Sequence, residues 1–365
     1  MKNIIKVLLY TEDIGLHGTS RAIVNLANMF ASKNYEVIFV YNCSLCSEHT
    51  LESSIKKVLL KSKRPLALKS KFLRILLLII NSVKLRKIIN SMEINYAIAF
   101  RPYCILQVIF ASIFSNTKTI ISVRVDPQTI FSTSHSKWFY KRLYSLADGC
   151  VFQTKEARDF FPERLKAKSV IIQNIVDKKL WEIECENERS DIIGVGRLSK
   201  QKNWHVAISA FSKIKDMIKE NFVIYGIGDS ECDLKEYVNQ IGLNDRIIFA
   251  GVTNEIESKI CNAKIFVLSS DYEGTPNALI EALILGIPCV CTKFKGGGAE
   301  NLIEARKNGL LVPRDDVDAF AKAMLQLLND TTYAETIGFN AKMRARKEFD
   351  PYLIFEQWES FIISI

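Results

Sequence analysis

The feature that most constrains the fold of this chain is a repeated alternation of short apolar segments with longer helical patterns. The apolar segments are rich in Ile and Val and bounded by polar residues, as in strands buried on both faces of a parallel sheet. In the first half, the predicted strands are Asn3–Tyr10, Glu36–Tyr41, Asn95–Phe100, Lys118–Val123, Gly149–Thr154 and Ser169–Asn174. In the second half, they are Asp191–Gly196, Asn221–Gly226, Arg246–Gly251, Lys264–Ser269, Pro288–Thr292 and Gly309–Pro313.

Helical patterns separate these strands. The segment Thr19–Ser32 is predicted to be a helix whose apolar face is formed by Ile23, Leu26, Ala27 and Phe30. The other helices that matter below are predicted for Asn203–Lys219, Pro276–Leu285 and Asp350–Ile365. Strand–helix alternation of this kind predicts parallel sheets with helices on both faces.

Two such series in 365 residues predict two doubly wound α/β domains. We expect the boundary in the charged segment Asp177–Arg189, which separates two apolar strands. The chain is therefore divided into an N-terminal domain of residues 1–180, a C-terminal domain of residues 181–348 and a last helix, 349–365.

The composition is that of a globular protein, with 48% hydrophobic and 24% charged residues, which argues against disorder. The net charge of +9 suggests an anionic partner, such as nucleic acid, an anionic membrane or a phosphorylated ligand. The nine cysteines are scattered, and only Cys43 and Cys46 form a C-x-x-C, so we expect reduced thiols. No apolar run is long enough to span a bilayer, the longest being Ile75–Ile80.

The first cluster of polar residues follows a predicted strand, in the segment Gly194–Asn203. Arg197 and Lys202 would lie at the sheet edge beside the start of a helix. A guanidinium, an ammonium and a helix N-terminus together suit a diphosphate. The alternative is an ordinary loop whose basic residues are solvated.

The second cluster, Asp271–Ala282, follows another predicted strand. Glu273 lies before a helix that contains Glu281, so the two carboxylates can face different parts of one ligand. Gly274 lets the backbone approach a ligand, and Pro276 suits the first turn of a helix. Carboxylates accept hydrogen bonds from the vicinal hydroxyls of a sugar. The alternative for Glu281 is a surface acid, but its apolar neighbours predict burial.

These two clusters resemble the motifs of the retaining glycosyltransferase family 4, which are G-x-G-R-L…K and E-G-x-P-x-x-x-x-E. The segment Gly286–Pro313 is also similar to a G-x-P-V…GG…E…NG-x-L-V-P stretch of that family. The resemblance implies the GT-B fold, in which two Rossmann-like domains face each other across a cleft and a C-terminal helix returns to the N-terminal domain. It also implies that the N-terminal domain binds the acceptor and the C-terminal domain the nucleotide sugar.

The resemblance further implies site residues. Arg197 and Lys202 would bind the donor diphosphate and stabilise the leaving group, Glu273 would face the donor sugar, and Glu281 would bind the ribose. The other donor-binding positions that it implies are Gly15, Gly18, Gly196, Gly251, Val252, Gly274, Thr275, Pro276, Asn277, Ala278 and Leu279.

The sequence departs from the family after the strand Lys118–Val123. Many members have a His-Asp pair facing the reaction centre there, whereas this chain has Arg124 and Asp126. These two residues are the catalytic candidates of the N-terminal domain. His17 and His135 are further candidates, but lone histidines are more often structural or exposed.

The implied reaction is retaining transfer without a metal or another cofactor. We find no D-x-D after a strand, because Asp315, Asp316 and Asp318 lie in a turn that enters a helix. Arg197 and Lys202 would serve as fixed cations in place of a metal. By family frequency the donor is expected to be a UDP-sugar carrying a hexose or N-acetylhexosamine.

The segment Lys56–Lys87 contains eleven Lys or Arg residues and no acid, interleaved with Leu and Ile. Such a segment can lie on an anionic membrane surface; the alternative is a core-packing helix with solvated cations. A lipid-linked saccharide acceptor, as in O-antigen, lipopolysaccharide or capsule synthesis, would explain it. We therefore expect a cytoplasmic enzyme that is peripheral at the inner face of the bacterial plasma membrane.

Three other readings stay open. An epimerase-type GT-B enzyme would turn over the donor without an acceptor. A basic nucleic-acid- or membrane-binding protein without catalysis is suggested by charge alone, and we expect no nucleic-acid partner because no such binding pattern occurs. A non-catalytic sugar-nucleotide binder is disfavoured because both cations and both acids of the two clusters are present.

Overall fold

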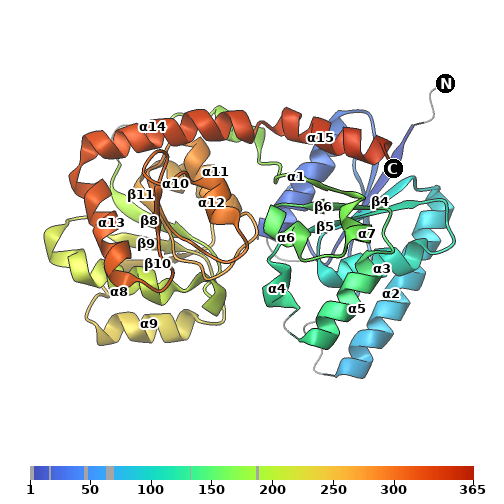
Figure 1. Ribbon diagram of the computed structural model, residues 1–365, viewed down its shortest axis with the longest axis horizontal. Helices are drawn as coiled ribbons and strands as arrows, with labels where there is room; N and C mark the ends of the chain where they lie inside the picture. The colour runs from blue at the N-terminus through green and yellow to red at the C-terminus, as the bar shows by residue number, and fades with distance from the viewer. Residues whose placement is uncertain (1–3, 16–17, 45–47, 63–69, 132, 186–188) are drawn as a thin grey trace. The chain divides into compact units, whose positions relative to one another are not determined.

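The structure, a computed structural model, describes residues 4–15, 18–44, 48–62, 70–131, 133–185 and 189–365. It divides into two compact units, which we call unit 1 (Met1–Ile175 and Pro351–Ile365) and unit 2 (Val176–Asp350). Figure 1 shows both units, each a twisted sheet flanked by helices. The C-terminal segment therefore belongs to the unit in which the chain begins.

Unit 1 contains a seven-stranded sheet in the order β3-β2-β1-β4-β5-β6-β7. All of its strand pairs are parallel. The strands are β1 (Lys6–Thr11), β2 (Glu36–Tyr41), β3 (Lys56–Leu59), β4 (Tyr96–Ala99), β5 (Lys118–Val123), β6 (Gly149–Phe152) and β7 (Ser169–Ile171). Its helices are α1 (Gly18–Ser32), α2 (Lys71–Met92), α3 (Pro102–Ser112), α4 (Pro127–Ile130), α5 (Ser134–Tyr144), α6 (Lys155–Asp159), α7 (Glu163–Lys166) and α15 (Pro351–Ile363).

Unit 2 contains a six-stranded parallel sheet in the order β10-β9-β8-β11-β12-β13. The strands are β8 (Asp191–Val195), β9 (Phe222–Tyr225), β10 (Ile247–Gly251), β11 (Ala263–Leu268), β12 (Cys289–Thr292) and β13 (Leu310–Val312). Its α-helices are α8 (Trp204–Ile214), α9 (Glu231–Gln240), α10 (Ile256–Cys261), α11 (Asn277–Ile284), α12 (Gly298–Leu302), α13 (Val317–Asn329) and α14 (Thr331–Glu348). Short 3₁₀ turns are η2 (Lys178–Trp181), η3 (Lys200–Lys202) and η4 (Lys215–Met217).

All the predicted strands are present, and the α/β class with two Rossmann-like domains is confirmed. The central strands are apolar throughout because helices cover both faces of each sheet. In unit 1, for example, Val7, Leu8 and Leu9 of β1 are all fully buried.

The basic segment from Lys56 to Lys87 spans more than one element of the fold. The segment contains two elements, since Lys56–Leu59 forms the edge strand β3 and α2 begins at Lys71, capped by the hydroxyl of Ser70. The edge strand escaped prediction because its outer positions carry Lys instead of apolar residues, as exposed edges often do.

The prediction that all cysteines are reduced thiols is wrong for one pair. Cys185 and Cys261 form a disulfide with a Cα–Cα distance of 5.1 Å, although 76 positions separate them in the sequence. Cys185 lies near the start of unit 2 and Cys261 ends α10, so only the folded chain brings them together. Cys43 has a free thiol, and Cys46 lies outside the described residues.

The last helix, α15, packs on unit 1 through aromatic side chains. The Phe355 ring contacts Phe30 in an edge-to-face arrangement with centroids 5.0 Å apart, and Trp358 stacks on Phe100. Tyr35 also donates a hydrogen bond of 2.7 Å to Glu359. These contacts bury the apolar face of α15 and hold the end of the chain on unit 1.

We predict that Phe355→Ala lowers the free energy of unfolding of unit 1 by about 3 kcal/mol, because it leaves a cavity beside Phe30. Urea denaturation of the full chain measures this change. The control is Ile363→Ala on the same helix, whose side chain is 61% exposed, and its effect should stay below about 0.5 kcal/mol. Equal effects of the two substitutions would contradict the packing of α15.

Candidate active site

The candidate site in unit 2 lies where the strand order of its sheet reverses. Strands β8 and β11 are neighbours in the middle of the sheet, and the loops that follow them leave the same edge. In open parallel sheets this point is where ligands bind, because the two loops diverge and leave a crevice. The two polar clusters of the sequence follow these two strands.

The structure brings Lys202 and Glu273 together. The Lys202 ammonium lies 2.6 Å from a carboxylate oxygen of Glu273, and both side chains are largely buried. The Ser270 hydroxyl donates a 3.0 Å hydrogen bond to the same oxygen. A partly buried ion pair with an added hydrogen bond is held firmly, since its desolvation is offset by two partners.

Backbone and amide contacts join the two loops. The amide of Asp271 donates to the carbonyl of Gln201, and the Gln201 side chain donates to the carbonyl of Tyr272. The Asn203 side chain donates to Asp271, and Asn203 itself adopts a left-handed conformation between η3 and α8, which Asn tolerates better than most residues. The position of Lys202 relative to Glu273 is therefore set by several independent contacts.

Two glycines make room for this arrangement. A Cβ added to Gly196 would lie 2.8 Å from the side chain of Lys202, so glycine lets that side chain cross the end of β8. A Cβ added to Gly298 would lie 1.9 Å from the carbonyl oxygen of Gly274, so the start of α12 packs directly against the loop of Glu273.

Arg197 and Tyr272 lie in the same neighbourhood. Burial raises the pKa of Tyr272, the Glu273 and Asp271 carboxylates add to the rise, and the Arg197 charge opposes it. The Arg197 side chain is exposed, whereas its carbonyl accepts a hydrogen bond from the Trp204 indole.

The other predicted residues of unit 2 lie on two elements. In α11, Glu281 is only 2% exposed and Leu279 is fully buried, while Asn277 and Ala278 are partly exposed at its first turn. Gly274, Thr275 and Pro276 are buried in the preceding loop. Gly251 ends β10 and Val252 follows it, at the edge of the sheet and two strands away from β8.

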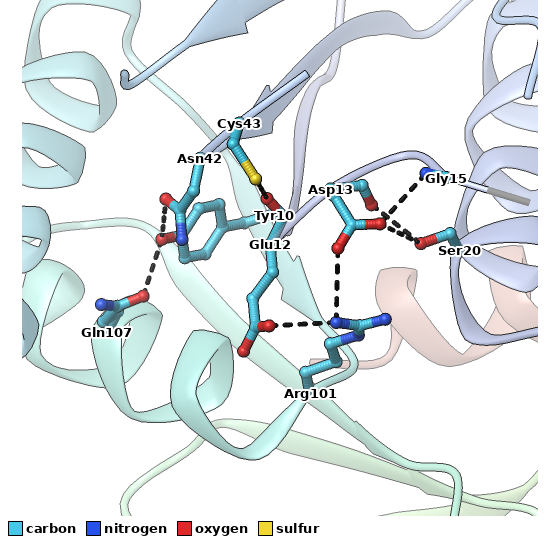
Figure 2. A network of polar contacts seen from close by, with 9 residues as sticks. All are labelled: Tyr10, Glu12, Asp13, Gly15, Ser20, Asn42, Cys43, Arg101 and Gln107. Carbon is cyan, nitrogen blue, oxygen red and sulfur yellow. Dashed lines mark hydrogen bonds and ion pairs between the residues drawn. The ribbon is translucent and has the colours of Figure 1, made fainter. Parts of the chain in front are cut away.

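Unit 1 has its own reversal of strand order, between β1 and β4, and a charged cluster lies there (Figure 2). The guanidinium of Arg101 lies 3.0 Å from a carboxylate oxygen of Glu12 and 3.6 Å from one of Asp13. Both carboxylates are buried, and Asp13 also accepts a hydrogen bond from the amide of Gly15. Gly18 begins α1 beside this cluster.

Sequence analysis did not select Arg101 or Glu12 as site residues. The signal was available, because Arg101 follows the predicted strand Asn95–Phe100 and Glu12 follows the first strand. Polar residues at the carboxyl ends of two central strands meet in the fold. Next to them, the hydroxyl of Tyr10 lies within hydrogen-bonding distance of the side-chain oxygens of Asn42 (2.8 Å) and Gln107 (2.6 Å) (Figure 2).

Arg124 and Asp126 do not join that cluster by any contact among the described residues. The Arg124 guanidinium lies over the Phe100 ring at 4.2 Å and donates to Asn174. Burial lowers the pKa of Arg124 to about 9. Asp126 caps α4, accepting hydrogen bonds from the amide of Gln128 and the hydroxyl of Thr129.

The remaining polar candidates lie elsewhere or outside the described residues. His135 is exposed in the first turn of α5, and His17 is not among the described residues. Asp316 caps α13, and Asp315 accepts a hydrogen bond from Asn203. In the part of the chain that the structure describes, no group of three His, Cys, Asp or Glu side chains is placed to hold a metal ion.

We predict that Gly298→Ala displaces the loop of Glu273, because the new methyl group would overlap the carbonyl of Gly274. Hydrogen exchange of the amides in residues 271–277 should become faster. The control is Gly242→Ala, where an added Cβ meets no atom within 4 Å and only backbone strain arises. Unchanged exchange in Gly298→Ala would show that the loop is not held by this contact.

Comparison with known proteins identifies relatives of this chain among glycosyltransferases. Residues 176–344 match the family model described as "Glycosyl transferases group 1". An α-1,4-N-acetyl-D-galactosaminyltransferase of Campylobacter jejuni, named for a diphospho-undecaprenol-linked substrate, is 25% identical over 99% of each chain. The putative colanic acid biosynthesis glycosyltransferase WcaL of Salmonella typhimurium is 32% identical over 48% of this chain and 45% of its own length.

Among solved structures, HepE of Anabaena in complex with UDP and glucose has the same fold. Its TM-score is 0.82 over 99% of this chain and 100% of that chain, with 18% sequence identity. These similarities show a GT-B fold. Residues 176–344 carry the sequence pattern of glycosyl transferases group 1, and the named relatives support the activity of a glycosyltransferase.

Proposed function

We propose that this chain is a retaining, metal-independent glycosyltransferase of family 4. In this proposal it transfers a hexose or N-acetylhexosamine from a UDP-sugar to a lipid-linked saccharide during bacterial surface polysaccharide synthesis. The observation that carries the proposal is the Lys202–Glu273 pair at the strand reversal of unit 2. The name of the Campylobacter relative supports the acceptor class, and the name of the Salmonella relative supports a role in polysaccharide synthesis.

The ion pair suggests how the donor is received. A donor phosphate would compete with Glu273 for the Lys202 ammonium, because both are anionic oxygen ligands. Release from Lys202 leaves the Glu273 carboxylate to accept hydrogen bonds from sugar hydroxyls. Arg197, whose side chain is exposed beside the pair, can add a second cation to the diphosphate.

In the transfer step, the bond between the anomeric carbon and the phosphate oxygen breaks. The acceptor hydroxyl oxygen bonds to that carbon on the same face, and its proton passes to the departing phosphate. Negative charge grows on the diphosphate as the bond breaks, so Lys202 and Arg197 stabilise the transition state more than the ground state. Glu281, held in the buried helix α11, would bind the donor ribose.

We predict that Lys202→Ala lowers kcat/KM at least ~100-fold, because a preorganised cation at the leaving group is lost. Release of UDP from UDP-sugars in the presence of a membrane lipid extract measures this rate. The control is Lys200→Ala, an exposed neighbour in the same turn, which should remain within about two-fold of the unaltered enzyme. A wild-type rate in Lys202→Ala would sink the assignment.

The same assay distinguishes a glycosyltransferase from an epimerase-type GT-B enzyme. Donor turnover that proceeds equally well without lipid extract would favour an epimerase-type GT-B enzyme. GDP- and ADP-sugars in parallel reactions test the choice of UDP.

Glu273→Gln should have a different effect from Lys202→Ala. We predict that it lowers kcat at least ~10-fold while the affinity for UDP is kept or increased, because Lys202 no longer has an internal anionic partner. Isothermal titration of UDP into each variant provides the measurement, with Lys202→Ala expected to weaken binding. If UDP bound more weakly to Glu273→Gln, the proposed exchange of partners would be wrong.

A further inference from the structure

Helix α2 leaves large apolar side chains in water. It packs on unit 1 through one face, where Asn81, Leu85 and Ile89 are buried. The apolar residues of α2 that are at least 41% exposed all lie between Phe72 and Val83; they are Phe72, Leu73, Ile75, Leu76, Ile79, Ile80 and Val83. In α2, every described residue before Asn81 is at least partly exposed. A helix that is apolar all round is normally covered by protein or lipid.

A second helix adds exposed aromatic residues at the same end of unit 1. In α5, Trp138 is 61% exposed and Phe139 is 44% exposed, and Ile130 of α4 is 41% exposed. Helices α2 and α5 both pack against α3, and both begin at the lower end of unit 1 in Figure 1. We call these residues of α2, α4 and α5 the apolar end of unit 1.

All charged residues within helices α2, α4 and α5 are positive. Residues 127–147, which include α4 and α5, contain Lys137, Lys141 and Arg142 and no acid, and α2 also has no acid. The Arg142 guanidinium lies over the Trp138 ring, with its central carbon 5.1 Å from the ring centroid. The basic residues thus flank the apolar surface without neutralising partners in the same helices.

This charge pattern selects the partner. A second copy of the chain would bring the same cations against each other, which opposes association. An anionic bilayer offers an apolar interior to the Leu, Ile and Phe side chains, and negative headgroups to Lys and Arg. Tryptophan is enriched at the boundary between these two zones.

We propose that the apolar end of unit 1 docks on the surface of an anionic lipid bilayer. The inference deepens the proposed function, because a lipid-linked acceptor would present its saccharide at that surface. The proposed docking surface includes only part of the segment Lys56–Lys87 expected from the sequence, because some basic residues of that segment contact the protein itself. Lys84, for example, donates a hydrogen bond to the carbonyl of Leu60 and so has a structural role. No helix in the described residues is both long and apolar enough to cross a bilayer.

The test is flotation of the full chain with vesicles of phosphatidylcholine, with or without phosphatidylglycerol. We predict that Phe72→Ser/Ile75→Ser lowers the coefficient for partition of the protein into vesicles at least ~10-fold. The reason is that two apolar side chains, which are exposed in the protein and would enter the bilayer, are removed. The matched control is Phe339→Ser/Met343→Ser on α14, whose side chains are 64% and 60% exposed. This control should float as the unaltered chain does.

Lys137→Glu/Arg142→Glu tests the electrostatic part. It should reduce flotation with anionic vesicles and remove most of its dependence on salt. Circular dichroism confirms that each variant folds, and UDP titration follows the donor site independently. Variants that no longer float with vesicles but still bind UDP would support the docking surface. If the unaltered chain floats with anionic vesicles but does not bind UDP, only the proposed function is refuted.

Three results would overturn the docking proposal. They are failure of the unaltered chain to bind anionic vesicles, undiminished flotation of Phe72→Ser/Ile75→Ser, and equal loss in the α14 control. A change from dimer to monomer in Phe72→Ser/Ile75→Ser, seen by light scattering without any effect on flotation, would show instead that a second copy covers this face.

Discussion

The ion pair between Lys202 and Glu273 is the interaction on which the candidate site depends. It joins the loops that follow two neighbouring parallel strands, β8 and β11, at the point where the strand order of the sheet reverses. Side chains from β8 and β11 meet there because helices leave the two strands toward different positions and their loops diverge. Gly196, Gly298 and Asn203 allow the close approach, so the geometry of the pair is a property of the backbone as much as of the charges.

The same sheet geometry produces the charged cluster of unit 1. There, one guanidinium from the end of β4 faces two carboxyl groups from the end of β1, so acids outnumber cations. Carboxylates accept hydrogen bonds from hydroxyls and repel phosphate. The cluster of Arg101, Glu12 and Asp13 therefore favours a ligand that carries hydroxyl groups, which in the proposed function is the saccharide acceptor. In the same proposal, the cations of unit 2 bind the donor.

The C-terminal helix explains the environment of Arg124. Helix α15 places Trp358 beside Phe100, and the Arg124 guanidinium lies over both rings, 4.2 Å from the Phe100 centroid and 5.7 Å from the Trp358 centroid. Cation–π contacts of this kind partly offset the desolvation cost of a buried guanidinium, which otherwise disfavours its charged form. Arg124 thus contributes to the attachment of α15 to the rest of unit 1.

The amino-acid sequence by itself determined the fold class and every strand except β3, and it selected Lys202 and Glu273, which the fold brings together. Buried parallel strands are continuous apolar runs, and loops that bind ligands follow them, so both features are local. The edge strand β3 lacked that pattern because one side of it has no neighbouring strand. The pairing of Arg101 with Glu12 and Asp13, the stacking of Arg124 and the Cys185–Cys261 disulfide were decided only by the tertiary structure. Each depends on contacts between residues far apart in the chain, which no local pattern of residues specifies.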